Sequence, residues 1–222
     1  MASLQKEKKG ASSRETKFRL DETREQEILD VAAQVFLTDG FSAASTNEIA
    51  RRANASKGTF YARFKNKEEL FLAVIERRSN AITESLVANL PQEPDTAITL
   101  HTFGTHLLKE VLSEQQVALL RIIGMEAHRF PSIGQRFYEL GPMRGQANLA
   151  KYFQGQIDLG RLVAANPARM GEHLMSLLMG GAVRWYMTGL IQEKPTPQKL
   201  KAHLEDAVSV FMRAYGEAGR KR

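Results

Sequence analysis

Apolar residues recur at the spacing of an α-helix along almost the whole chain, and this pattern limits the fold more than any other feature. Ile28, Val31, Ala32, Val35 and Phe36 fall at i, i+3, i+4, i+7 and i+8, which lines one face of a helix. No segment alternates apolar and polar residues with a period of two, as a half-buried strand would. The sequence therefore predicts an all-α fold of about nine helices.

Turn and capping residues divide this pattern into segments. Asp39-Gly40 ends the first helix, because glycine readily adopts the left-handed backbone found at helix C-termini. Ser45 and Glu48 are spaced as a capping box, in which the serine hydroxyl accepts from the backbone N–H of Glu48 and the carboxylate reaches back. Ser56 and Asn66 are predicted N-caps of the next two helices. After the first helix, the predicted helices are residues 46–53, 57–64, 67–90, 96–112, 115–129, 133–153, 167–190 and 198–215.

Positive charge is concentrated in two short stretches. The formal net charge of the chain is +6, yet residues 1–20 carry a net +4 and residues 44–67 a net +5, so the remainder is net negative. A local excess of this kind is expected of a surface that binds phosphate. A charge run by itself is more often a solvated face, so the structural context has to decide between the two.

Composition excludes several classes of protein. The chain has no cysteine, which removes disulfides, thiolate zinc sites and a cysteine nucleophile. Its apolar runs are shorter than the ~18 residues of a membrane span, and its N-terminus lacks the apolar stretch of a secretory signal, so we expect a cytoplasmic protein without membrane contact. His101 and His106 stand at i and i+5, on different faces of a helix, and do not predict a metal site. We expect no catalytic residue, metal or cofactor, and therefore no enzyme.

The predicted helices 46–53 and 57–64 form a helix-turn-helix pattern behind the first helix. The second of them needs an inward anchor, and Phe60 and Phe64, at i and i+4, supply it. Gly58 carries no side chain, so a base or phosphate can approach its backbone closely. We therefore expect three parts, which are a flexible basic arm at residues 1–20, a helix-turn-helix domain at 21–66 and a larger helical domain at 67–222.

The run Ser56-Lys57-Gly58-Thr59-Phe60-Tyr61, continued by Phe64-Lys65-Asn66-Lys67-Glu68-Glu69-Leu70, is the most specific signal in the chain. With it, residues 24–71 resemble the DNA-binding domain of TetR-type bacterial transcriptional regulators. The chain departs from that pattern at Asn54, where glycine is common, but asparagine tolerates a left-handed turn. The resemblance implies that double-stranded DNA is bound by Ser45 and Thr46 at the phosphate backbone, by Lys57, Gly58, Thr59 and Tyr61 in the major groove, and by Lys65 and Lys67 at further phosphates.

The C-terminal half contains Glu126-Ala127-His128-Arg129-Phe130-Pro131 and Gly160-Arg161-Leu162-Val163. These stretches resemble the AefR-like ligand-binding type of the same family, which implies a helical domain that binds a ligand and forms a homodimer. Segments 167–190 and 198–215 are apolar enough to pair across a two-fold axis, although both could instead pack inside one subunit. The residues expected at the dimer interface are Leu174, Leu178, Leu204, Val208 and Phe211.

Aromatic, methionine and histidine side chains in segments 96–190 are candidate walls of a ligand pocket. An ordinary core position is the better interpretation of any one of them taken alone. Few charges lie inside these helices, which favours a small lipophilic effector over a phosphorylated metabolite. The candidate pocket residues are Phe103, His106, Met125, His128, Phe137, Tyr138, Trp185 and Tyr186.

The sequence thus predicts a ligand-responsive DNA-binding transcriptional regulator, a repressor that a small lipophilic effector releases from a palindromic operator. Two alternatives stay open, namely an architectural DNA-binding protein without a ligand and an all-α enzyme or carrier with an incidental basic hairpin. Absence of an internal cavity would favour the architectural protein. DNA binding that is weak and hardly changes with salt would favour the enzyme or carrier.

Overall fold

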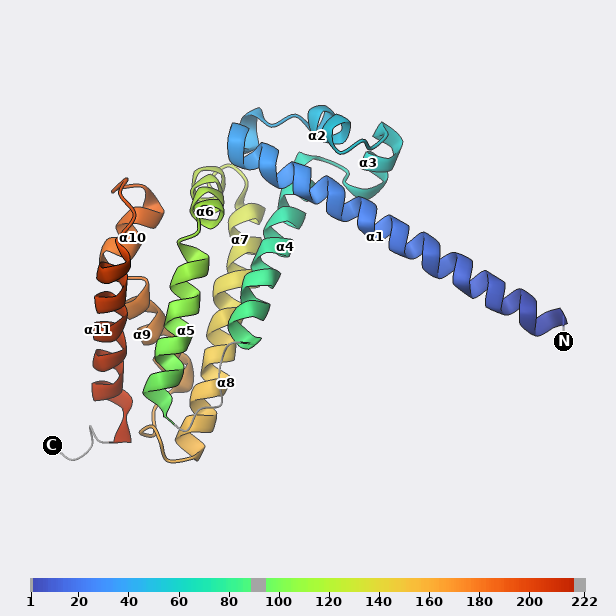
Figure 1. The fold of residues 1–222 in the computed structure, drawn as a ribbon. Coiled ribbons are helices and arrows are strands. Elements are labelled where there is room, and N and C mark those ends of the chain that lie inside the picture. Colours follow the sequence, from blue (N-terminus) through green and yellow to red (C-terminus); the bar gives the residue numbers. More distant parts are fainter. Residues whose placement is uncertain (1, 89–94, 218–222) are drawn as a thin grey trace. The chain divides into compact units, whose positions relative to one another are not determined.

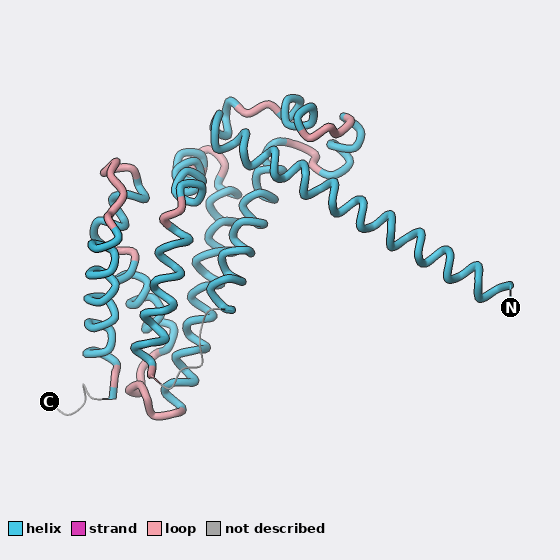
Figure 2. The backbone as a smooth tube through the Cα atoms, viewed as in Figure 1, coloured by secondary structure: helices cyan, strands magenta, loops and turns pink. Residues whose placement is uncertain are grey.

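A computed structural model describes residues 2–88 and 95–217, with side chains at 23–86 and 95–217 (Figure 1). These residues form helices and loops, and the one β-type pairing among them is a bridge between Leu162 and Gly216 (Figure 2). No helix in this part of the chain is long and apolar enough to cross a membrane. The all-α prediction is confirmed, and the chain divides into two compact units, Met1–Val74 and Ile75–Arg222.

The apolar face predicted for the first helix is buried in the core of the first unit. Ile28, Val35 and Phe36 are at most 1% exposed. Phe36 packs against Phe71 with ring centroids 4.8 Å apart, and Phe41 contacts both rings. Three aromatic side chains thereby join α1 (Ala2–Ala43) to the start of α4 (Lys67–Ala88). The other helices of this unit are α2 (Thr46–Arg52) and α3 (Lys57–Arg63).

The caps predicted for α3 and α4 are confirmed. Ser56 Oγ accepts from the backbone N–H of Thr59 at 3.0 Å, and Asn66 Oδ1 accepts from that of Glu69 at 2.8 Å. The Glu69 carboxylate in turn accepts from the backbone N–H of Lys65 at 2.8 Å. Local hydrogen bonds therefore fix where both helices start, as the capping residues require.

The backbone is helical from Ala2 onward, through the stretch 1–20 that is predicted to be a flexible basic arm. Met1 lies outside the described residues. The stretch contains no proline and is rich in lysine, glutamate, glutamine and arginine, which are good helix formers, so local propensity permits a helix continuous with α1. The regular helix ends at Gly40, where φ is +76°, as the sequence predicts, and one further helical turn follows before Ala43.

The second unit is a bundle of packed helices. Helices α5 and α11 pack along each other, α9 packs on both α8 and α11, and α6 contacts α7 and α10 (Figure 1). Phe153 and Phe211 stack in its core with ring centroids 5.1 Å apart. The unit contains the rest of α4, α5 (Thr96–Val111), α6 (Glu114–Glu126), α7 (Pro131–Tyr138), α8 (Arg144–Asp158), α9 (Pro167–Leu178), α10 (Gly181–Thr188) and α11 (Pro197–Tyr215).

Two predicted helices are each divided in the structure. The predicted helix at 133–153 consists of α7 and α8 joined by the π-helical turn η1 (Glu139–Met143), which contains Pro142. Proline has no backbone N–H to donate, so a regular α-helical bond cannot form there. The predicted helix at 167–190 breaks between α9 and α10 at Gly180 and Gly181, where Gly181 has a φ of +54°.

Candidate functional site

Helix α3 is held by aromatic anchors and presents polar residues to solvent. Phe60 and Phe64 are 1% and 4% exposed, which confirms their predicted anchoring role. Lys57 and Gly58 are exposed, and Tyr61 is 47% exposed. A tyrosine that is half exposed beside buried phenylalanines is free to meet a partner with its ring and its hydroxyl.

Gly58 is not required by the packing of the first unit. A Cβ atom built on it meets only the Ser56 hydroxyl, at 3.8 Å, which is an ordinary contact. Its φ lies outside the left-handed region, so an L-side chain would fit the backbone as well. The missing side chain therefore leaves the backbone at this position open to solvent.

Side chains from α2 and α3 meet on the same exposed surface. The hydroxyl oxygens of Thr46 and Tyr61 lie 3.5 Å apart, across the turn between the two helices. The Thr59 hydroxyl shares a hydrogen bond of 2.8 Å with that of Ser56, which fixes its orientation. We call Thr46, Lys57, Gly58, Tyr61 and Lys65 the α3 surface, and Lys65 is exposed there.

Lys67 differs from the role expected for it. Its ammonium group donates to the backbone carbonyls of Ser42 and Ala44, at 2.8 and 3.1 Å, and lies 4.9 Å from the centroid of the Phe41 ring. An ammonium group has three donors, so two of them are used inside the protein. Lys67 thus ties the start of α4 to the end of α1, a role that sequence spacing does not reveal.

The turn between α2 and α3 is supported from α1. Asn54 has a φ of +50°, so asparagine supplies the left-handed conformation that glycine would otherwise provide. The guanidinium of Arg24 donates to the Asn54 carbonyl and also pairs with Glu27 at 2.6 Å. These contacts fix the angle at which α3 follows α2.

The capping box expected at α2 forms on one side only. Ser45 Oγ accepts from the backbone N–H of Glu48 at 3.4 Å, as predicted. The Glu48 carboxylate does not reach back. It accepts from Arg51 and Arg52 at 2.7–2.8 Å, and these bonds lower its pKa from 4.5 to about 2. Both arginines, counted in the basic stretch 44–67, are therefore partly neutralised by this carboxylate.

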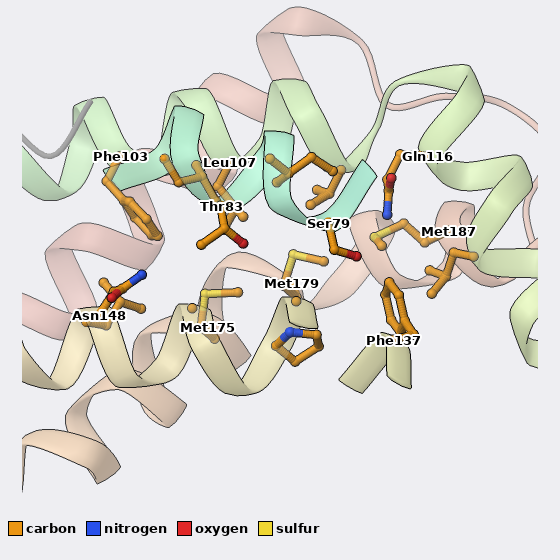
Figure 3. A pocket seen from close by; sticks show the side chains of 18 residues that line it. Ser79, Thr83, Phe103, Leu107, Gln116, Phe137, Asn148, Met175, Met179 and Met187 are labelled. Carbon is orange, nitrogen blue, oxygen red and sulfur yellow. The ribbon is translucent and has the colours of Figure 1, made fainter. Parts of the chain in front are cut away.

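A cavity of about 300 Å³ lies inside the second unit. In Figure 3, Phe103 and Asn148 lie at one end of it, and Gln116, Phe137 and Met187 at the other. No charged side chain lines it among the described residues. Its remaining wall consists of Ser79, Ile82, Thr83 and Leu86 from α4, with Leu107, Val111, Leu120, Gly141, Pro142, Gly145, Leu149, Met175 and Met179.

Three polar side chains of the wall are almost fully buried. Ser79, Thr83 and Gln116 are 6%, 9% and 6% exposed. Within the described residues the hydroxyls of Ser79 and Thr83 have no hydrogen-bond partner, and Figure 3 shows both facing the cavity. Both residues border the cavity, so their hydroxyls are placed to hydrogen-bond a ligand or water inside it.

Of the eight residues expected to line a pocket, Phe103 and Phe137 line this cavity and the others do not. Tyr186 is half-buried and lies under the guanidinium of Arg121, 5.7 Å from its ring centroid. Periodicity could not separate inward from outward aromatics on these helices. Four expected residues are exposed, Met125, His128, Tyr138 and Trp185, and His106 is half-buried away from the cavity.

The sequence analysis missed the wall that α4 supplies. Ser79 and Thr83 stand on the same helical face as Ile75, Ile82 and Leu86. Small hydroxyl residues that interrupt an apolar stripe were a usable signal of a cavity. Without the fold, however, a serine in such a stripe is equally compatible with a helix that is partly exposed.

The five residues expected at a dimer interface are buried within their own subunit. Their side chains fill the core of the second unit, so they are not available to a partner. Apolar periodicity identifies a face that is buried but does not say whether the same chain or a second one buries it. The residues are Leu174, Leu178, Leu204, Val208 and Phe211, each at most 7% exposed.

Sequence models of known protein families match both units. The model described as bacterial regulatory proteins of the tetR family matches residues 28–74, and that of the AefR-like transcriptional repressor C-terminal domain matches residues 98–217. The chain belongs to the TetR family. It is a DNA-binding, ligand-responsive transcriptional regulator, and both resemblances seen in the sequence are confirmed.

Individual relatives agree with this assignment. The HTH-type transcriptional regulator AcrR of Shigella flexneri is 28% identical over 209 residues, which cover 91% of this chain and 94% of that protein. The crystal structure of a TetR-family regulator from Mesorhizobium loti superposes with a TM-score of 0.81 at 28% identity, covering 88% and 98% of the two chains. The flavonoid-responsive regulator FrrA gives 0.72 at 30% identity, with the same coverage. These relatives are regulators rather than enzymes.

Proposed function

We propose that this protein is a homodimeric repressor that binds a palindromic operator through the α3 surface and is released by a small, neutral, largely apolar effector in the cavity. The observation that carries the proposal is the continuity of α4. The same helix begins at Lys67, in the DNA-binding unit, and supplies Ser79 and Thr83 to the cavity wall. A ligand that contacts α4 acts on an element that the DNA-binding unit also packs against.

The α3 surface supports DNA as the partner. Lys57 and Lys65 are exposed, and no side-chain interaction occupies their ammonium groups within the described residues. Such groups provide phosphate contacts, while Gly58 and Tyr61 lie where base edges can be read. Phosphate contacts release counterions, so operator affinity should fall steeply as salt rises.

A palindrome requires two copies of α3, about 34–36 Å apart, and one chain carries one. TetR-family regulators act as dimers, so we place the interface on the outward faces of α9, α10 and α11. Trp185 of α10 and Val210 of α11 are 46% and 40% exposed there, unlike the five buried residues named above. A glutamate at position 210 should split the dimer, because it would place an unpaired charge in the interface. Light scattering that still reports a dimer would exclude this face.

The cavity supports a neutral effector. A charged ligand would lose its hydration without gaining an opposite charge, since the wall carries no ionised side chain among the described residues. Three methionines, Met175, Met179 and Met187, give part of the wall an adaptable shape. FrrA is by name responsive to flavonoids, which are flat aromatic molecules with carbonyl and hydroxyl groups. That chemistry matches an apolar cavity that also contains two hydroxyls and two amides.

The cavity also bears on the alternatives. An architectural DNA-binding protein has no use for an apolar cavity lined by the helix that begins in its DNA-binding unit. Within the described residues, no group of three or more metal-ligating side chains supports an enzyme or carrier that depends on a metal. The regulator is therefore the function we put to the test.

The test begins with operator selection from random DNA by the purified protein. We expect a two-fold symmetric sequence whose binding weakens with salt. Flavone and hydroxylated flavones are then added, and thermal shift and operator release are measured together. Selection of no symmetric sequence would contradict the proposal. Compounds that stabilise the protein but leave operator affinity unchanged would contradict the effector mechanism alone.

A further inference from the structure

Gln116 contacts the cavity and α4 at the same time. Its side chain is 6% exposed and lines the cavity from α6, and its Oε1 accepts a hydrogen bond from Nε of Arg78 on α4 at 3.3 Å. Arginine has donors only, so the atom facing it is the oxygen. The amide nitrogen is therefore left to face the cavity, as Figure 3 shows.

Arg78 fastens α4 to the corner between α5 and α6. A terminal nitrogen of its guanidinium lies 3.3 Å from Oε2 of Glu110 and 3.2 Å from Oγ of Ser113. With Gln116, three groups from that corner hold one side chain of α4. The ion pair is about 70% buried on both sides, so solvent screens it less than a surface pair.

The geometry of Gln116 makes this attachment sensitive to a ligand. The amide group is planar, so its oxygen and nitrogen move together when the side chain turns. A ligand oxygen that accepts from Nε2 draws the nitrogen inward and turns the oxygen away from Arg78. The bond to Arg78, at 3.3 Å, is already slightly longer than the usual ~2.7–3.2 Å, so a small rotation opens it.

We propose that Gln116 transmits effector binding to α4 by exchanging its hydrogen bond with Arg78 for one with a carbonyl or hydroxyl oxygen of the ligand. This rests on the proposed function, in which the cavity binds a neutral effector. The hydroxyls of Ser79 and Thr83 orient the same ligand from α4 itself. The Arg78–Gln116 link then favours the DNA-binding state, and the effector favours the released state.

The test compares variants that cut the link from either side. Arg78→Met and Gln116→Met keep side chains of similar length but lose the hydrogen bond. Without any effector, each should weaken operator binding at least about fivefold, the lower end of ordinary allosteric coupling. The double variant should be no weaker than Arg78→Met, because that single change already removes the bond between Arg78 and Gln116.

Reciprocity separates this role from a merely structural one. If Arg78→Met shifts the protein toward the released state, the variant must bind flavone more tightly than the parent protein does. The gain in flavone affinity can be as large as the loss in operator affinity. A folding defect would weaken both. Flavone should release the parent protein, whereas 2-phenylnaphthalene, which has a similar shape but no oxygen, should bind without releasing it.

Arg136→Met is the matched control. Arg136 also pairs with α4, through Glu76 at 3.0 Å, but neither residue lines the cavity. For the Arg136→Met variant, the ratio of operator affinity with flavone to operator affinity without it should equal that of the parent protein. Unchanged operator affinity in Arg78→Met, or additive losses in the double variant, would overturn the link. The comparison of operator affinities without effector tests the link alone. If the parent protein fails to bind a palindrome, that result counts against the proposed function instead.

Discussion

The two units of this protein are both built of helices, but the first has a filled core and the second contains a cavity. The first unit is filled by aromatic side chains, with Phe36, Phe41 and Phe71 in mutual contact, and its free polar groups point outward. The second unit leaves a cavity of about 300 Å³ and turns hydroxyls and amides inward. The contrast fits the partners proposed above, which are DNA on the exterior of the first unit and a small apolar molecule inside the second.

The largest effect that would test this contrast between a filled and a hollow unit is on the free energy of unfolding. Phe36→Ala should cost about 3–5 kcal/mol, because the surrounding rings cannot close the space it leaves. Met175→Ala at the cavity wall should cost less, about 2 kcal/mol, because that side chain already lacks neighbours on one side. Differential scanning calorimetry measures both changes. Equal losses would mean that the second unit is as closely packed as the first.

Gly58→Leu should leave the fold intact and damage DNA binding. A Cβ atom at this position meets one hydroxyl at 3.8 Å inside the protein, so the added side chain projects outward. We expect a loss of about 1–3 kcal/mol in operator binding, the value of a good base contact. Fluorescence anisotropy gives the affinity, and circular dichroism checks the fold. Full operator affinity would remove α3 from the DNA contact.

Gly145→Leu should fill the cavity from its own wall. A Cβ atom on Gly145 meets no heavy atom within 4 Å, and the residue lines the cavity. Flavone affinity should fall at least about tenfold, equal to 1.4 kcal/mol. Gly155→Leu is the control, since Gly155 lies on the same helix with equal room but away from the cavity. Titration calorimetry that finds both variants equally affected would place the effector elsewhere.

Lys57→Met and Lys67→Met should differ although both remove one lysine from the DNA-binding unit. Lys57 has no partner within the described residues, so its loss should reduce the slope of log affinity against log salt by about 0.9. Lys67 donates to the carbonyls of Ser42 and Ala44, so its loss should lower the melting temperature and leave that slope unchanged. A reduced slope in Lys67→Met would mean that the ammonium group leaves those carbonyls for DNA.

The smallest expected effect is on the stability of the protein at low pH. Glu48 has its pKa lowered from 4.5 to about 2 by Arg51 and Arg52, so the unfolded chain takes up its proton first as pH falls. Its contribution to stability is present above pH 4.5 and is lost between there and about pH 2. In Glu48→Gln that part of the acid dependence should disappear. Because the ion pairs of Glu48 with Arg51 and Arg52 are exposed, added salt should reduce the difference between Glu48→Gln and the parent protein. Glu193→Gln serves as a control, since Glu193 is exposed and has no ion pair among the described residues.

Much of the local structure followed from the sequence because its causes are local. The caps at Ser56 and Asn66, the end of the regular helix at Gly40 and the left-handed turn at Asn54 each depend on residues within one helical turn. The anchors Phe60 and Phe64 followed from i, i+4 spacing for the same reason. The resemblance of residues 24–71 to the TetR family rested on the run from Ser56 to Leu70 together with that order of helices.

The choice among competing local partners and the contacts between distant residues did not follow from the sequence. The sequence suggested that Glu48 closes a capping box, yet two arginines one helical turn away compete for its carboxylate and win. It also suggested that Leu204 and Phe211 lie at a dimer interface, although both are buried in the core of their own unit. Spacing shows that a face is buried but does not identify what buries it.

The sequence by itself determined the all-α fold, the helix-turn-helix and the family, since these depend on periodicity and on short runs of residues. Tertiary structure alone decided that Lys67 caps the end of α1, that α4 forms a wall of the cavity, and that Gln116 joins the cavity to Arg78. Arg78 and Gln116 are 38 residues apart. A hydrogen bond between them depends on how α4 and α6 pack, and packing is a property of the whole unit rather than of either helix.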